Sequence, residues 1–154
     1  MLKYTDTKVT FQEVPDEITL CINISGCRIN CPECHSPYLS QDIGTSLDES
    51  TLMPLIGKND GISCVAFMGG DSEPEEINKL AAAVRDMGLK TCWYSGKQGL
   101  AEEVDINNLS YLKLGPYMKD KGPLNSKTTN QRFFAVINGG LTDITYRFYT
   151  KEDI

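Results

Sequence analysis

The chain has 154 residues, of which 40% are hydrophobic and 23% are charged. This composition is typical of one soluble globular domain spanning residues 1–154, and it excludes a disordered or fibrous chain. The net charge of −6 and the lack of a long apolar segment argue against a basic nucleic-acid surface and a transmembrane helix. We therefore expect a cytoplasmic protein with neither a nucleic-acid nor a membrane partner.

The first clear element is a strand over residues 18–24, where isoleucine and leucine alternate with smaller or polar residues. It leads directly into a cysteine-rich loop. Residues 46–57 then predict a helix that opens with a Ser-x-x-Glu capping box. A nearly continuous apolar run over residues 62–68 follows, as expected for a parallel strand covered on both faces.

The second half continues the alternation of strands and helices. After a Gly-Gly-Asp segment at 69–71, a second Ser-x-x-Glu pattern and apolar residues at helical spacing predict a helix over residues 72–88. A strand over residues 89–94 then ends at Ser95. The remaining elements are predicted as a short helix at 100–104 and strands at 111–114, 132–137 and 144–149.

Strands that alternate with helices predict an α/β fold with a mostly parallel sheet. Each glycine-containing or polar segment of interest directly follows a predicted strand, and ligands collect at the C-terminal edge of such sheets. A closed eight-stranded barrel needs about 250 residues. We therefore predict a partial, open (β/α) barrel with its site at the C-terminal edge of the strands and an open side for a large substrate.

Three of the six cysteines, Cys27, Cys31 and Cys34, form a C-x3-C-x2-C motif after the first predicted strand. A closed zinc site, or a four-iron cluster held by cysteine alone, needs four ligands. Three interpretations are open: zinc with His35 as the fourth ligand, reduced thiols without a metal, and an iron–sulfur cluster with one open iron. We favour the last, because the adjacent Cys34 and His35 seldom both reach one tetrahedral ion.

The other three cysteines, Cys21, Cys64 and Cys92, are separated from one another in the sequence. Each lies in an apolar, strand-like run, so we predict that they are buried core residues. Three clustered and three scattered cysteines favour a reducing compartment over a secreted disulfide framework.

Gly69 and Gly70 permit a positive φ and a close approach of the backbone, which makes their segment a candidate ligand contact. The following helix would add the positive end of its dipole. A tight strand-to-helix turn explains the same glycines without a ligand. The position one strand after the cysteine loop favours ligand binding, and the mismatch to a G-x-x-x-x-G-K-[ST] loop argues against a nucleoside triphosphatase.

The cysteine spacing, the Cys-His-Ser-Pro segment at 34–37 and the Gly-Gly-Asp segment at 69–71 resemble radical S-adenosylmethionine enzymes. Three further features narrow the resemblance to the activating proteins of anaerobic ribonucleotide reductases. These are the small size, a Lys-Leu-Gly-Pro-Tyr segment that begins at Lys113, and a Thr-Thr-Asn-Gln-Arg segment that ends at Arg132. The resemblance covers most of residues 18–138.

Members of that family cleave S-adenosylmethionine reductively at a 4Fe-4S cluster and produce a 5′-deoxyadenosyl radical. The resemblance implies that Cys27, Cys31 and Cys34 hold the cluster and are the catalytic centre. It implies further cofactor contacts by Gly69, Gly70 and Asp71 along the methionine amino group, by Glu33 and His35 beside the adenine, and by Ser95 and Lys113 near the ribose and carboxylate.

The resemblance also implies that the radical passes to a protein. The expected substrate is a glycine of the anaerobic ribonucleotide reductase large subunit, and the expected electron donor is a low-potential protein such as flavodoxin or ferredoxin. We expect residues 119–132, with Lys119, Lys121 and Lys127, to form part of the docking rim, although a solvated loop explains these lysines equally well. The alternatives are an activase of a different glycyl-radical enzyme, a non-catalytic iron–sulfur electron carrier and a zinc-bound interaction module.

Overall fold

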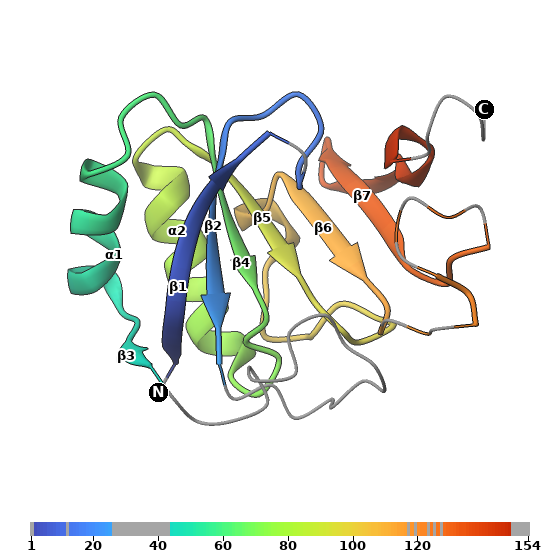
Figure 1. Cartoon of the computed structure of the whole chain (residues 1–154), viewed down its shortest axis with the longest axis horizontal. Helices are drawn as coiled ribbons and strands as arrows, with labels where there is room; N and C mark the ends of the chain where they lie inside the picture. The colour runs from blue at the N-terminus through green and yellow to red at the C-terminus, as the bar shows by residue number, and fades with distance from the viewer. Residues whose placement is uncertain are drawn as a thin grey trace.

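The computed structural model describes residues 2–11, 13–25, 44–116, 118, 120–122, 124, 126 and 128–148. These residues form an α/β fold around one open, eight-stranded sheet (Figure 1). The strands are β1 (Lys3–Thr10), β2 (Thr19–Ile24), β3 (Thr45–Ser46), β4 (Cys64–Met68), β5 (Lys90–Tyr94), β6 (Tyr111–Leu114), β7 (Arg132–Ile137) and β8 (Gly140–Asp143). The helices are α1 (Glu49–Gly57) and α2 (Pro74–Asp86), with short 3-10 helices η2 (Ile106–Asn108) and η3 (Thr145–Phe148).

The sheet is mixed, with strand order β3-β1-β2-β4-β5-β6-β7-β8. The central strands β2, β4, β5 and β6 pair in parallel, and the flanking strands pair antiparallel, so three pairings are parallel and four are antiparallel. The prediction of an open α/β fold is confirmed at this level, but the prediction of a mostly parallel sheet is wrong. The connection from β1 to β2 has eight residues (11–18), and a two-residue turn joins β7 to β8. Both connections are too short for the crossover that a parallel pair needs, so these pairs are antiparallel.

The C-terminal hairpin was not predicted, although its signal is in the sequence. Asn138 and Gly139 have φ values of 52° and 78°, as a two-residue hairpin turn of type I′ requires. This turn starts β8, so the predicted strand at 144–149 is wrong and η3 occupies most of that range. The predicted short helix at 100–104 is also wrong, because the described backbone there forms turns.

The two long helices begin close to the predicted positions but with different caps. Asp48 caps α1, since its Oδ1 accepts a hydrogen bond from the Thr51 N–H at 3.1 Å. Ser46, the predicted cap, lies in β3 instead. Pro74 occupies the first turn of α2, where its missing N–H leaves no helical bond unmade.

Both long helices cover the same face of the sheet, as Figure 1 shows. The strands β2, β4, β5 and β6 lie in the sheet in the order in which they occur in the chain. Each crossover therefore steps in the same direction, and crossovers of one hand place α1 and α2 on one face. The main hydrophobic core lies between this face and the helices, and its largest buried side chains are those of Trp93 and Phe67.

The opposite face holds a second, smaller core, because successive strand residues point to opposite sides. Cys21, Cys64 and Cys92 are buried there as free thiols beside Phe133, so their prediction as core residues is confirmed. Burial raises the pKa of the Cys21 thiol and that of the Cys64 thiol to about 12. Burial also raises the pKa of Cys92 well above its ordinary value. These three thiols are therefore protonated and unreactive in the folded protein at neutral pH.

Candidate functional site

The cysteine motif itself lies outside the described residues. Cys27, Cys31 and Cys34, with the neighbouring Glu33 and His35, are among residues 26–43, so their assignment as cluster and adenine contacts stays a prediction. Among the residues that are described, no group of three His, Cys, Asp or Glu side chains is placed to hold a metal ion. The rest of the predicted site is described, and it lies at the C-terminal ends of the central strands.

The ends of β4, β5 and β6 together form what we call the strand-end rim, defined by residues 69–71, 95–97 and 113–115. Main-chain hydrogen bonds continue the sheet into this rim, from the Gly69 N–H to the Tyr94 carbonyl at 3.1 Å and from the Ser95 N–H to the Lys113 carbonyl at 2.9 Å. Gly69, Gly70, Asp71, Ser95 and Lys113 were each predicted from sequence as cofactor contacts. All five lie in the rim, and β2, which precedes the cysteine motif, is the next strand along the sheet.

Gly69 and Gly70 both adopt positive φ, at 112° and 89°. A Cβ at Gly69 would lie 3.1 Å from the Ile24 carbonyl oxygen, and a Cβ at Gly70 would lie 2.6 Å from Cδ1 of Ile77 on α2. The missing side chains would thus point into the protein. Packing of the turn against β2 and α2 is therefore sufficient to require glycine at both positions.

Asp71 joins the end of β4 to the end of β5. Its carboxylate accepts a hydrogen bond from the Ser95 hydroxyl at 2.5 Å and another from the Gly96 N–H at 2.9 Å. Asp71 is 6% exposed and Ser95 is 1% exposed. The Ser95 hydroxyl in turn accepts a hydrogen bond from the Lys97 N–H at 3.2 Å, so the carboxylate and hydroxyl are both used within the rim.

Lys113 joins the end of β6 to the same point on β5. Its ammonium group donates hydrogen bonds to the Ser95 carbonyl at 3.2 Å and to the Gly115 carbonyl at 2.7 Å. The same group lies 5.9 Å from the centre of the Tyr94 ring, within the range of a cation–π contact. Lys113 is 8% exposed, so the rim holds one buried carboxylate and one buried ammonium group.

Two further groups of residues support the rim, and neither was predicted as part of the site. The Trp93 indole donates a hydrogen bond to the Gly69 carbonyl at 2.7 Å and fixes the first residue of the turn. On the other side, Gln131 Nε2 donates to the Gly115 carbonyl at 3.4 Å, and Asn130 Nδ2 donates to the Pro116 carbonyl at 3.0 Å. The Asn-Gln pair lies in a segment that carried the family resemblance, which was the available signal.

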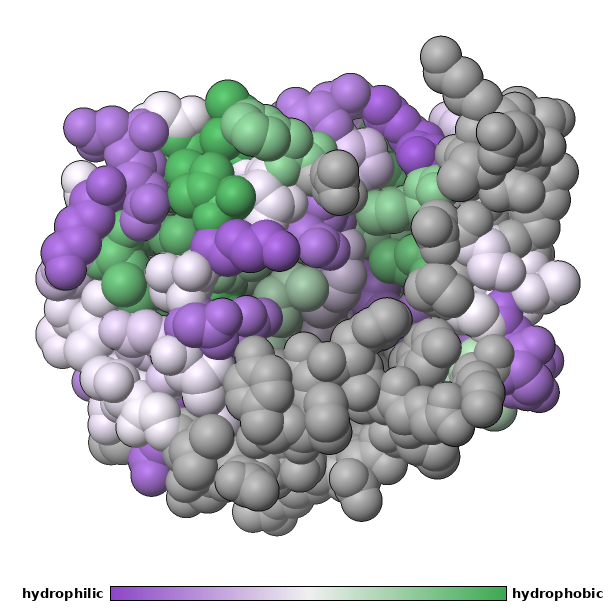
Figure 2. Space-filling view, in the orientation of Figure 1, coloured by the Kyte–Doolittle hydropathy of each residue, from purple (hydrophilic) through white to green (hydrophobic). Residues whose placement is uncertain are grey.

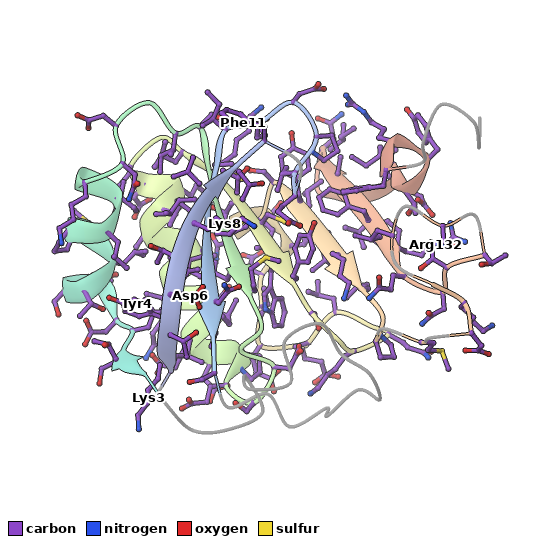
Figure 3. The ribbon with its side chains drawn as sticks, viewed as in Figure 1. Lys3, Tyr4, Asp6, Lys8, Phe11 and Arg132 are labelled. Atoms are coloured by element: carbon purple, nitrogen blue, oxygen red, sulfur yellow. The ribbon has the colours of Figure 1, made fainter. Side chains whose placement is uncertain are left out.

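The sheet face opposite the helices carries polar groups near the end of β2. Asn23 Nδ2 donates a hydrogen bond to Asp6 Oδ2 at 3.0 Å, and an irregularity of β1 lies between Tyr4 and Asp6. Figure 3 shows Asp6 and Lys8 along β1 on the face turned to the viewer, away from α1 and α2. Figure 2 shows that this face is hollowed over the middle of the sheet, with hydrophilic and hydrophobic residues side by side.

The predicted docking rim is described only in part. Lys121 is exposed in the segment between β6 and β7, and Thr128 Oγ1 donates to its carbonyl at 2.7 Å. Lys119 and Lys127 lie outside the described residues. Within the described ranges, no helix has the length and hydrophobicity that a membrane span requires.

Comparisons with protein-family models, with curated proteins and with solved structures found no match to this chain. The sequence motifs and the geometry of the rim are therefore the observations that bear on function.

Proposed function

We propose that this protein is a radical S-adenosylmethionine activase that installs a glycyl radical on an anaerobic ribonucleotide reductase. The observation that carries this proposal is the strand-end rim. Segments that lie 24 residues apart (Asp71 and Ser95) and 18 residues apart (Ser95 and Lys113) in the sequence meet at one sheet edge, next to the strand that leads into C-x3-C-x2-C. A cofactor that contacts both the cysteine motif and the later strand ends would bind at this edge.

The proposed fold is a partial (β/α) barrel of the radical S-adenosylmethionine type, built from β2, β4, β5 and β6. Two observations support it. These strands follow chain order without a reversal, whereas a doubly wound sheet has a switch point where the order reverses. In addition, α1 and α2 cover only one face, as the outer helices of a barrel do.

The residues at the rim fit the proposed cofactor in their chemistry. Cys27, Cys31 and Cys34 would hold the 4Fe-4S cluster, which with S-adenosylmethionine supplies the 5′-deoxyadenosyl radical. Asp71 and Lys113 hold the main chain of the rim in place, and main-chain N–H and carbonyl groups suit a methionine moiety that carries a carboxylate and an ammonium group. The buried bonds of the rim fix its main-chain groups before any ligand arrives, which favours binding.

The proposed protein partners follow from the open face. A 5′-deoxyadenosyl radical abstracts hydrogen only from a group held close to it, and the hollow over the middle of the sheet, on the face shown in Figure 2, offers room for such a group. A backbone glycine on a loop of the reductase large subunit would enter there. A low-potential flavodoxin or ferredoxin would supply the electron, in the cytoplasm.

The decisive experiment is anaerobic reconstitution with iron and sulfide, followed by electron paramagnetic resonance with and without S-adenosylmethionine. We expect a 4Fe-4S signal that changes when the cofactor is added, and cleavage of the cofactor to 5′-deoxyadenosine after reduction. Changing any one of Cys27, Cys31 or Cys34 to Ala should abolish the cluster. The matched controls Cys21→Ala, Cys64→Ala and Cys92→Ala should retain it, because these thiols are buried in the second core.

Each alternative has a different outcome in this experiment. A cluster signal that the cofactor leaves unchanged would favour an electron carrier. Stoichiometric zinc without iron would favour an interaction module, and cofactor cleavage without activation of the reductase would point to another glycyl-radical enzyme. A full iron content in Cys31→Ala with a loss in Cys64→Ala would overturn the ligand assignment.

A further inference from the structure

Hydrogen bonds connect the residues of the strand-end rim to one another across the ends of three strands. Ser95 is the centre of this network: its hydroxyl donates to Asp71 and accepts from the Lys97 N–H, and its carbonyl accepts from the Lys113 ammonium group. Its N–H donates to the Lys113 carbonyl. Four polar contacts thus converge on a residue that is 1% exposed.

We propose that Asp71 and Ser95 are positioning residues that hold the ends of β4 and β5 together, and that the main chain of the rim contacts the ligand. The inference rests on the proposed function for the identity of the ligand, but the positioning role itself does not depend on it. The Asp71 carboxylate is already bonded to a hydroxyl at 2.5 Å and to an N–H at 2.9 Å. A carboxylate that is so engaged and 6% exposed has little surface left for a ligand ammonium group.

The proposal assigns a different role to Asp71 than direct contact with the methionine amino group. The Gly96 N–H follows the last residues of β5 and is held by Asp71 Oδ2. Losing this carboxylate would leave the Gly96 N–H and the Ser95 hydroxyl without their acceptor, while main-chain bonds to the end of β6 would still hold Ser95 and Lys97. The loop would then lose its side-chain link to the turn after β4, and the rim would become less rigid around Gly96.

The test compares Asp71→Asn with Asp71→Ala, because both changes remove the same charge. Asparagine can still accept from the Gly96 N–H through Oδ1 and donate to the Ser95 hydroxyl through Nδ2, whereas alanine can do neither. Amide hydrogen exchange of the protein without cofactor provides the first measurement. In Asp71→Ala, the loss of two hydrogen bonds should lower the protection of the Gly96 amide about tenfold or more. In Asp71→Asn, the protection of this amide should stay within about threefold of the wild-type value, a limit set by the net contribution of one hydrogen bond.

A second variant approaches the network from the other side. Ser95→Ala should lower the protection of the Lys97 amide, whose acceptor is the Ser95 hydroxyl. The matched control Asp86→Asn changes an exposed carboxylate at the end of α2 and should change neither amide. Unchanged Gly96 protection in Asp71→Ala, or equal losses in Asp71→Asn and Asp71→Ala, would overturn the positioning role.

Equilibrium binding of S-adenosylmethionine to the reconstituted protein provides the second measurement. If Asp71 positions the rim, Asp71→Asn should bind more tightly than Asp71→Ala by about the same tenfold factor, since two hydrogen bonds separate the variants. Equal weakening in both variants would instead assign Asp71 to direct charge contact and overturn the proposal. A wild-type protein that binds no S-adenosylmethionine would refute the proposed function, and the exchange experiment would still decide the positioning role.

Discussion

Gly70 shows how one residue can serve packing and ligand approach at the same time. Its φ of 89° is in the region that favours glycine, and an added Cβ would lie 2.6 Å and 3.0 Å from the outer carbons of Ile77. The sequence interpretation treated this glycine as an opening for a ligand. The structure gives it a role that exists before any ligand is bound, because it lets the turn after β4 pack against α2.

We therefore expect Gly70→Ala to lower the free energy of unfolding by about 1–3 kcal/mol, from backbone strain and from overpacking against Ile77. Chemical denaturation of the cofactor-free protein measures this loss. Gly57→Ala is the matched control, since no atom lies within 4 Å of its added Cβ. The double variant Gly70→Ala with Ile77→Ala tests whether overpacking contributes. If it does, the double variant should lose less free energy of unfolding than the sum of the losses in the two single variants.

A ligand-only role for Gly70 makes the opposite prediction. In that case Gly70→Ala and the larger change Gly70→Val would leave unfolding unchanged and weaken only the binding of S-adenosylmethionine. We expect both variants to keep the cluster, because neither changes a cysteine, and to lose stability and cofactor affinity together.

At the scale of elements, the turn between β1 and β2 is attached to the starts of three other strands by one side chain. The Glu17 carboxylate accepts hydrogen bonds from Ser63 Oγ at 2.7 Å, Lys90 Nζ at 2.8 Å and Tyr111 Oη at 2.9 Å. Ser63 directly precedes β4, and the other two residues begin β5 and β6. Glu17 thus fixes the sheet edge opposite the strand-end rim.

Glu17 is 6% exposed, and this burial by itself raises the pKa of its carboxyl group. The hydrogen bonds from Lys90, Ser63 and Tyr111 have a larger opposite effect, so the pKa of Glu17 is lowered overall. The stabilisation that the Glu17 hydrogen bonds contribute is therefore fully present above the unfolded-state pKa of about 4.3. They are lost as the pH falls through the lower folded-state pKa, where the carboxyl becomes protonated.

We expect Glu17→Gln to lower the free energy of unfolding by about 1–3 kcal/mol at pH 7, because Lys90 loses its charged partner and the buried network loses an acceptor. The difference between wild type and variant should shrink as the pH falls below about 4.3. Urea denaturation at several pH values measures it, with the exposed Glu103→Gln as control. A difference that stayed constant down to low pH would show that Glu17 acts through packing and not through its charge.

The sequence predicted the central elements well for a physical reason. The strands β2 and β4 to β6 are covered on both faces or alternate strictly, so burial leaves a clear pattern in their residues. Strands β1, β3 and β8 are exposed or only two residues long, and burial leaves no comparable pattern there. The type I′ turn at Asn138-Gly139 was the exception, since its dipeptide is visible in the sequence and implies a reversal.

At the scale of the whole molecule, the sequence predicted which segments meet but not how they interact. Strand-end positions were enough to bring residues 69–71, Ser95 and Lys113 to one edge. The bond between Asp71 and Ser95 could not be predicted, because it depends on the alignment of β4 with β5, which pairs Met68 with Tyr94. The role of the cysteine motif as a cluster site remains a prediction from sequence alone.

Long-range charge should affect how fast the protein associates with its proposed partner, the reductase. The chain carries a net charge of −6, and Lys121 is exposed in the segment that follows the rim. We expect Lys121→Glu to slow glycyl-radical formation in the reductase several-fold at low salt, because steering is electrostatic, and to match wild type at high salt. Lys58→Glu makes the same charge change beyond α1 and should have no effect. Equal rates for Lys121→Glu and wild type at every salt concentration would remove Lys121 from the docking surface.

The strand order has a consequence for how the protein folds during its synthesis on the ribosome. When the short β3 at the far edge is set aside, every strand of the described sheet from β2 onward pairs with the strand before it in the chain. Each new strand can therefore join a ready neighbour as it leaves the ribosomal tunnel, and none has to insert between strands that are already paired. Since the N-terminal part of the chain leaves the tunnel first, this sheet can grow in the direction of translation, with β8 as its last addition.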